Sequence, residues 1–126
     1  MTDIDKQIEY WRAGAGEDWE VAVKLVQDGQ TRHDLFFAHL SLEKMLKALI
    51  CRRSNDLAPR LHNLTRLSEM AGLSLDEKRA DLLADMNQFH IEGRYPGLLP
   101  VALTRAEADG YLDRAEEVME WLRQQL

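Results

Sequence analysis

Apolar residues recur at three- and four-residue steps through almost the whole chain, and no stretch alternates apolar and polar positions as a half-buried strand would. The first apolar stripe lies within residues 3–28 and consists of Ile4, Ile8, Trp11, Ala15, Trp19, Ala22 and Val26. Its period predicts one long helix with a single apolar face. Gly14 and Gly16 weaken the middle of this helix, where we expect a kink or a break, and Gly29 is well placed to end it.

The second and third helices are predicted between residues 31 and 71. Thr31 is a suitable N-cap for a helix that fades near residue 54, before the loop that contains Pro59. The inner face of this helix comprises Leu35, Ala38, Leu42, Met45, Leu46 and Leu49. A short third helix should cover residues 62–71 and stop at Gly72. Its inward residues are Leu64, Leu67 and Met70.

The fourth and fifth helices are each preceded by residues that match a capping box. Ser74 and Glu77 match it before the fourth helix, which should run to about residue 90. The buried residues of the fourth helix are expected to be Leu82, Leu83, Met86 and Phe89. Glycines and prolines between residues 93 and 100 then break regular structure. Thr104 and Glu107 open the last helix, whose apolar stripe is Ala108, Tyr111, Leu112, Ala115, Val118, Met119 and Leu122.

Four long amphipathic helices and one short helix, joined by short connections, predict an all-α fold, an antiparallel up-and-down bundle. The 126 residues suit a single domain over residues 1–126 with one core. Apolar residues make up 45% of the chain and charged residues 30%, an ordinary globular balance that excludes extensive disorder. The single cysteine, Cys51, excludes an internal disulfide.

The chain shows no sign of a membrane segment. Acidic residues stand near the N-terminus where a signal peptide needs an apolar run, and no stretch approaches the ~18 apolar residues of a membrane span. We therefore expect a cytoplasmic protein without a membrane partner. Three tryptophans and an Ala/Val/Leu-rich first helix should leave apolar surface after the core is filled, which favours a homodimer.

Charge is distributed unevenly along the chain. The net charge of −6 argues against broad, non-specific binding of polyanions. Residues 43–66, however, hold six bases and two acids, a local +4, whereas the rest of the chain holds ten bases and twenty acids, or −10. One basic zone on an acidic body is typical of a site for a localised anion such as a phosphate; solvated helix ends would give the same pattern.

Familiar catalytic patterns are missing from the sequence. There is no glycine loop of the phosphate-cradling or dinucleotide-binding type, and no serine-centred nucleophile elbow. No pair of histidines or cysteines has the spacing of a zinc site; His33 and His39 are six residues apart, which separates them around a helix. We therefore expect no metal site and no cofactor.

The second predicted helix carries the first candidate site. His39, Glu43 and Lys47 follow one another at four-residue steps and so lie roughly along one line of the helix. His39 and Glu43 are close enough in this arrangement to share a hydrogen bond, with Lys47 adding positive charge beyond them. Such a line suits the grip of a phosphate, but it also suits a polar ridge beside the core.

The end of the fourth predicted helix carries the second candidate. Arg94 follows a glycine and precedes Tyr95 and Pro96. The planar guanidinium of Arg94 fits a phosphate, and the ring of Tyr95 is suited to stacking on a base. The alternative is that Arg94 caps the helix by bonding its last carbonyl groups.

At these two places the sequence resembles the HEPN domain family. The resemblance rests on three stretches, which occur in the order and at the spacing of the family and span essentially the whole chain. They are Ala38-His39-Leu40-Ser41-Leu42-Glu43-Lys44-Met45-Leu46-Lys47-Ala48, Leu61-His62-Asn63-Leu64 and Glu92-Gly93-Arg94-Tyr95-Pro96. The five-helix pattern derived from the periodicity agrees with the fold of this family.

The resemblance implies a dimeric helical bundle that acts beside a small nucleotidyltransferase. Many HEPN proteins are RNases, commonly toxins restrained by such a partner in a toxin-antitoxin pair, and others are assigned nucleotide binding alone. By this resemblance the ligand-binding residues are Lys44, Lys47, His62 and Arg94, which would contact phosphate or base, together with Tyr95.

One difference from the family pattern distinguishes a binding function from RNA cleavage. The RNase branch has an arginine followed after four to six residues by a histidine near the start of a late helix, and no histidine follows Arg94 at that distance. Arg32 and His39 have the spacing but lie in the second predicted helix. The leading hypothesis is therefore a nucleotide- or partner-binding module without catalysis. The alternative is a metal-independent RNase in which Arg94 steadies the phosphate and His62 or His90 moves protons.

Overall fold

The computed structural model describes residues 2–29, 31–94 and 103–126, with all side chains except those of residues 31, 32 and 91–94. These residues form five helices and no strand. The helices are α1 (Asp3–Gln27), α2 (Thr31–Ser54), α3 (Leu64–Met70), α4 (Glu77–Arg94) and α5 (Arg105–Gln125). The predicted all-α class and the packed helical bundle are confirmed. Among the described helices, none is both long and apolar enough to cross a bilayer.

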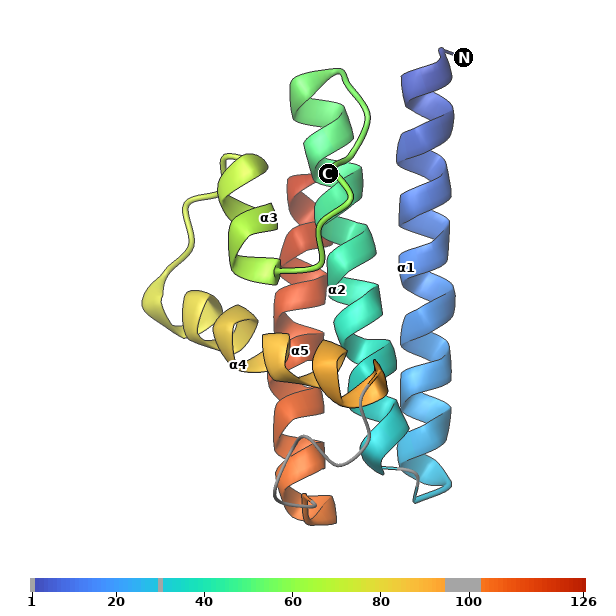
Figure 1. Cartoon of the computed structure of the whole chain (residues 1–126), viewed down its shortest axis with the longest axis vertical. Helices are drawn as coiled ribbons and strands as arrows, with labels where there is room; N and C mark the ends of the chain where they lie inside the picture. The colour runs from blue at the N-terminus through green and yellow to red at the C-terminus, as the bar shows by residue number, and fades with distance from the viewer. Residues whose placement is uncertain (1, 30, 95–102) are drawn as a thin grey trace.

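Helix α2 lies at the centre of the bundle. It contacts α1, α3, α4 and α5, and Figure 1 shows α1 antiparallel beside it and α5 on its other side. Helix α4 crosses the long axis of these helices, with the short α3 above it in this view. Because α2 is covered from several sides, even its polar side chains are buried, and these include His39, Ser41, Glu43 and Lys47.

The core follows the predicted apolar faces closely. The expected inner faces of α2, α4 and the last turns of α5 are buried, and Phe89 is the bulkiest of the fully buried side chains. The ring of Tyr111 packs edge-on against Phe89, with centroids 5.2 Å apart. The expectation that Met70 points inward is wrong: α3 is so short that Leu64 and Leu67 fill its inner face, and Met70 is 42% exposed.

The capping box of α5 and the glycine stops match the sequence signals, whereas Thr31, expected as an N-cap, is already the first residue of α2. The hydroxyl oxygen of Thr104 accepts from the backbone N–H of Glu107, and the carboxylate of Glu107 accepts from the backbone N–H of Thr104, each at 3.1 Å. At α4 the predicted capping box is wrong, since Asp76 and not Ser74 accepts the first-turn bond, from the N–H of Arg79 at 3.0 Å. Gly29 and Gly72 both follow helix ends with positive φ, as predicted.

Helix α1 is continuous through Gly14 and Gly16, so the expected kink or break is wrong. Tertiary packing explains the difference. The hydroxyl of Ser41 on α2 donates to the carbonyl oxygen of Ala15 at 2.7 Å, and Ala15 itself is fully buried. A Cβ added at Gly14 would lie 3.1 Å from Cδ of Lys44, whereas one at Gly16 would meet nothing within 4 Å. Close contact with α2 thus holds this part of α1 helical.

This difference between the glycines predicts that substitution by alanine changes the free energy of unfolding differently at the two positions. Gly16→Ala should raise the free energy of unfolding by about 0.5–1 kcal/mol, because alanine lowers the backbone entropy of the unfolded chain without a steric cost. Gly14→Ala should gain less or lose stability, because its methyl group crowds Lys44. Urea denaturation of the two variants measures both values, and an equal gain in both would contradict the close α1–α2 contact.

Candidate functional site

The buried carboxylate of Glu43 is the centre of the candidate site. Its side chain is 6% exposed, and it lies midway along α2. The ammonium of Lys47, one turn further on, donates to Oε2 of Glu43 at 3.1 Å, so the positive charge expected beyond Glu43 pairs with it directly. Nδ1 of His62 lies 3.1 Å from Oε1 and 3.2 Å from Oε2 of the same carboxylate. Glu43 therefore joins α2 to the loop before α3.

Lys47 is almost as inaccessible as its partner, with 6% of its side chain exposed. Its ammonium lies 5.1 Å from the ring centroid of Trp11 on α1, a cation–π contact. A buried ammonium ion is stable only when it is paired. The Glu43–Lys47 pair is thus a neutral unit enclosed by α1 and α2.

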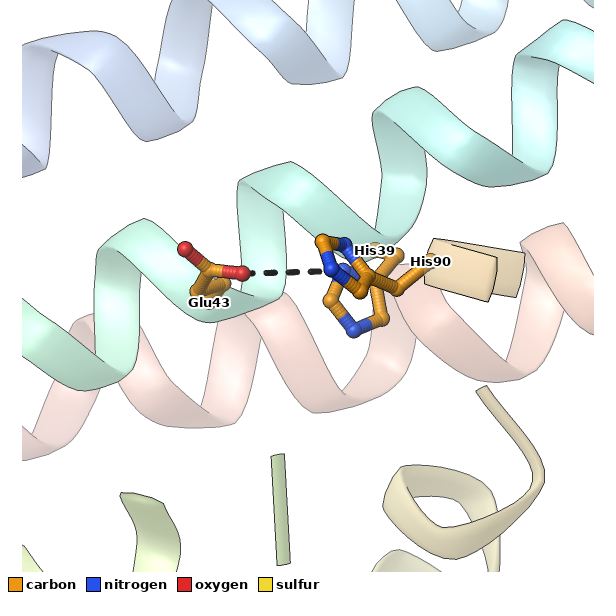
Figure 2. A group of neighbouring side chains, drawn as sticks. All are labelled: His39, Glu43 and His90. Atoms are coloured by element: carbon orange, nitrogen blue, oxygen red, sulfur yellow. Dashed lines mark ion pairs between the residues drawn. The ribbon is translucent and has the colours of Figure 1, made fainter. Parts of the chain in front are cut away.

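Three histidines lie next to this pair. The rings of His62 and His90 stack with centroids 4.4 Å apart and planes 20° from parallel. The ring of His39 also stacks on His90, at 5.2 Å and 28°, and Figure 2 shows these two rings overlapping beside the carboxylate of Glu43. His39 belongs to α2, His90 to α4, and His62 to the loop before α3. The fold thus gathers imidazoles from three separate segments around one carboxylate.

The expected hydrogen bond between His39 and Glu43 is absent. Nδ1 of His39 lies 3.8 Å from Oε1 of Glu43, which is too long for a hydrogen bond. The carboxylate oxygens are already held by Lys47 and His62, which explains the gap. Burial lowers the pKa of His39 to about 4, although the charge of Glu43 opposes this shift. His39 is therefore a neutral imidazole near pH 7.

His62 is the accessible member of the cluster, with 43% of its side chain exposed. An ionised carboxylate only accepts hydrogen bonds, so Nδ1 of His62 must carry the hydrogen that Glu43 accepts. The second ring nitrogen, Nε2, is then available as a proton acceptor in the neutral ring or as a donor in the cation. A carboxylate that fixes a histidine in this way is suited both to anion binding and to proton transfer.

The other predicted ligand-binding residues are placed differently. The ammonium of Lys44 lies 2.7 Å from a carboxylate oxygen of Asp18, so its charge is paired across the α1–α2 contact. The side chain of Arg94, which ends α4, and the whole of Tyr95 lie outside the described residues. The structure therefore brings together Lys47 and His62 of the predicted set.

Sequence reasoning missed two aromatic members of the cluster and undervalued a third residue. Trp11 was assigned only to the apolar stripe of α1, and Phe36, whose ring stacks on His90 at 6.4 Å, was not singled out. His90 was named only in the catalytic alternative. No local signal finds Trp11 and His90, because they reach the cluster from α1 and α4, whereas Phe36 lies on α2, three residues before His39, and its spacing could have found it. The positions of Trp11 and His90 relative to Glu43 become apparent only once the helices are packed.

A hollow of about 460 Å³ lies between α4 and α5, away from the Glu43 cluster, and Arg79, Leu82 and Arg114 are among its lining residues. Both of its arginines are already paired, since Arg79 lies 2.7 Å from Glu117 and Arg114 lies 3.2 Å from Asp85. Because both acidic and basic side chains line this hollow, it favours neither an anionic nor a cationic ligand. The Glu43 cluster is the stronger candidate because it combines burial, converging polar groups and an accessible histidine.

The buried pair makes a sharp prediction about stability. Glu43→Leu should lower the free energy of unfolding by about 3–5 kcal/mol, because it leaves the ammonium of Lys47 buried without a counter-charge. Glu43→Leu combined with Lys47→Met should recover most of that loss. Urea denaturation of both variants tests this, with Glu69→Ala at the exposed Arg66–Glu69 pair as a control that should change stability by less than about 1 kcal/mol. Equal stability of the single and double variants would show that the ion pair is unimportant.

Comparison with known proteins agrees with this architecture. The model of the HEPN domain family matches residues 8–125. No curated protein is similar enough to match. Among solved structures, TT1696 from Thermus thermophilus superposes with a TM-score of 0.81 at 22% identity, covering 95% of this chain and 98% of that chain. ST0689, an archaeal HEPN homologue, superposes with a TM-score of 0.75 at 20% identity, covering 94% and 96%. These likenesses show the fold, and the family match shows that the chain belongs to the HEPN domain family.

Proposed function

We propose that this HEPN protein binds a phosphate-bearing ligand, a nucleotide or an RNA backbone, at the face of the Glu43 cluster where His62 is exposed. The observation that carries the proposal is the contact between His62 and Glu43. Nδ1 of His62 is held at 3.1 Å by a buried carboxylate, while 43% of the side chain is exposed. The ring is thus fixed in orientation and can still reach a ligand.

The charges around His62 support an anionic ligand. The buried Glu43–Lys47 pair is neutral as a unit, so the carboxylate repels an approaching phosphate only weakly. Arg60 and Arg66 flank His62 along the chain, and both are exposed. Of the two lysines first expected to touch phosphate, Lys47 is better suited to positioning Glu43, and Lys44 is engaged by Asp18. Phosphate would therefore be contacted by His62 and Arg60, since Arg66 is already paired with Glu69 at 3.1 Å.

Arg94 and Tyr95 complete the proposed site. Arg94 follows His90 by four residues within α4, about one helical turn, and His90 stacks directly on His62. By the family resemblance, the guanidinium of Arg94 is suited to a second phosphate contact, and the ring of Tyr95 to stacking on a base. This part of the proposal rests on the family resemblance and on the sequence spacing.

The protein is proposed to act as a homodimer beside a small nucleotidyltransferase, as the family resemblance implies. Apolar side chains on the surface support a protein partner: Tyr10 is 64% exposed and Leu57 is 63% exposed. Leu57 and the 38% exposed Leu61 lie in the loop that also carries His62. A partner that covers this loop would restrict access to the site.

Binding of ATP and of a short single-stranded RNA tests the proposed site. His62→Ala and Arg94→Ala should each weaken binding at least tenfold, about 1.4 kcal/mol, because each removes a phosphate contact. Isothermal titration measures the affinity, and nucleotide-induced stabilisation against heat should disappear in parallel while the unliganded variants stay folded. His33→Ala is the matched control, since His33 is exposed on the first turns of α2, and its affinity should not change. Unchanged affinity in both site variants would refute the proposal.

The fixed orientation of His62 also favours a second candidate, a metal-independent RNase toxin subunit. In that reaction a histidine takes the proton of the ribose 2′-hydroxyl, whose oxygen attacks phosphorus, and the 5′-oxygen leaves with a proton from an acid. Glu43 would orient His62 as the base, and the adjacent His90 is suited to supply the leaving-group proton. The sequence departure at Arg94 stands against this candidate.

Incubation of the protein with bulk RNA in the presence of a chelator decides between binding and cleavage. A nuclease should leave 2′,3′-cyclic phosphate ends and lose at least about a hundredfold of its rate in His62→Ala. The His33→Ala protein is again the control and should cut as fast as the parent. Intact RNA with the parent protein would remove the nuclease candidate for bulk RNA, and it would leave the binding proposal in place.

A further inference from the structure

Two imidazoles and a carboxylate converge at the buried end of the Glu43 cluster. His39 and Glu43 lie one turn apart on α2, and His90 reaches the same point from α4 (Figure 2). One ligand atom from each of the three residues lies within 4.8 Å of the others. His39 and Glu43 are buried and His90 is half-buried. This set of donors differs from the exposed His62 face on which the proposed function rests.

His39 supplies an independent indication that the position takes a ligand. Its side chain is fully buried, yet neither Nδ1 nor Nε2 makes a hydrogen bond of ordinary length among the described residues; the backbone of His62 interacts with the ring, and the carboxylate of Glu43 lies 3.8 Å from Nδ1. Leaving such a group unsatisfied in the interior costs free energy, so proteins rarely do so without a reason.

The separation of the two rings suits a single ion, although their present orientation does not. Two imidazoles bound to one tetrahedral zinc ion, with Zn–N distances of about 2.0–2.1 Å, have ring centroids roughly 5 Å apart. The centroids of His39 and His90 are 5.2 Å apart, but the rings are stacked with planes 28° from parallel, so one ring has to turn before a nitrogen of each can bind the same ion. Donor atoms on a tetrahedral ion are roughly 3.3 Å from one another, so the carboxylate and the rings must move inward from their present positions.

The two carboxylate oxygens of Glu43 face different neighbours. Oε1 is the oxygen nearer His39, at 3.8 Å from Nδ1, and Oε2 accepts from the ammonium of Lys47. Oε1 can therefore bind an ion while Oε2 keeps its bond to Lys47, an outer contact that orients the ligand. His62 competes for the same carboxylate, and the Lys47 charge repels a cation. Both effects reduce affinity below that of a dedicated structural site.

We propose that His39, Glu43 and His90 bind a divalent transition-metal ion, with zinc as the natural choice. Two imidazole nitrogens and one carboxylate oxygen suit zinc, cobalt or iron(II), whereas magnesium and calcium prefer oxygen ligands. Three protein ligands leave a position for water or for a group from a bound molecule. No zinc spacing is visible along the chain because the third ligand comes from a different helix.

Zinc titration of the apo-protein in a non-coordinating buffer, without nucleotide or RNA, tests this site directly. Calorimetry should show one ion bound per chain, and cobalt should give the intense visible absorption of a tetrahedral ion. In the parent protein labelled with 15N-histidine, one equivalent of zinc should shift the ring nitrogens of His39 and His90, and it should not shift those of His33. This measurement needs no variant and so does not depend on whether a substitution folds.

Variants then separate the metal site from the proposed phosphate site. His90→Ala and Glu43→Gln should each weaken zinc binding at least tenfold, with helicity checked by circular dichroism. His33→Ala should leave it unchanged, and His62→Ala should leave it unchanged or tighten it. The absence of zinc and cobalt binding, or zinc-induced shifts confined to His33 and His62, would overturn the metal site. Because ATP and RNA are absent, failure of this site and failure of the proposed function are distinguishable.

Discussion

A carboxylate buried in the middle of the central helix sets the strongest constraint on this molecule. Glu43 is 4% exposed, and an isolated charge at that depth would be very costly. The protein meets the cost with an ammonium from the same helix and an imidazole from the loop before α3. Both partners are themselves constrained, Lys47 by the ring of Trp11 and His62 by stacking on His90. One buried charge thereby specifies how α1, α2, α4 and the loop meet.

The contacts of Glu43 are buried only because α2 is enclosed by the other described helices. A helix on the surface would place Glu43 in water, where its contacts with Lys47 and His62 would contribute little. Enclosure makes the same contacts strong and at the same time keeps His39 neutral. The chemistry available at the site is thus a consequence of the bundle, and it depends on the position of α2 within it.

The sequence predicted the helices well because helical period, caps and glycine stops are local signals. The stripes of α2, α4 and α5 predicted the core, and the capping box at Thr104 predicted the start of α5. The Glu43–Lys47 pair was predictable for the same reason, since both residues lie on one helix. The continuity of α1 was not, because Ser41 of another helix stabilises it at Ala15. The approach of His62 and His90 likewise depends on packing between segments and carries no local signal.

Family membership and site geometry lead to complementary conclusions. The match over residues 8–125 identifies the domain, and similarity at 20–22% identity to two solved structures supports the same fold. Neither transfers a ligand or a reaction, because one fold hosts many functions. The specific chemistry argued for this chain comes from its own residues, above all from the fixed His62 and the unsatisfied His39.

The most direct test of the account is the tautomer of His62, read from two-bond 1H–15N spectra of histidine-labelled protein at mildly alkaline pH. If Glu43 holds Nδ1, the neutral ring must carry its hydrogen on Nδ1, against the usual preference for Nε2, and Glu43→Gln should weaken that preference. The account predicts the Nδ1–H form in the parent protein. An Nε2–H form in the parent that is insensitive to the change at Glu43 would contradict the central role of the buried carboxylate.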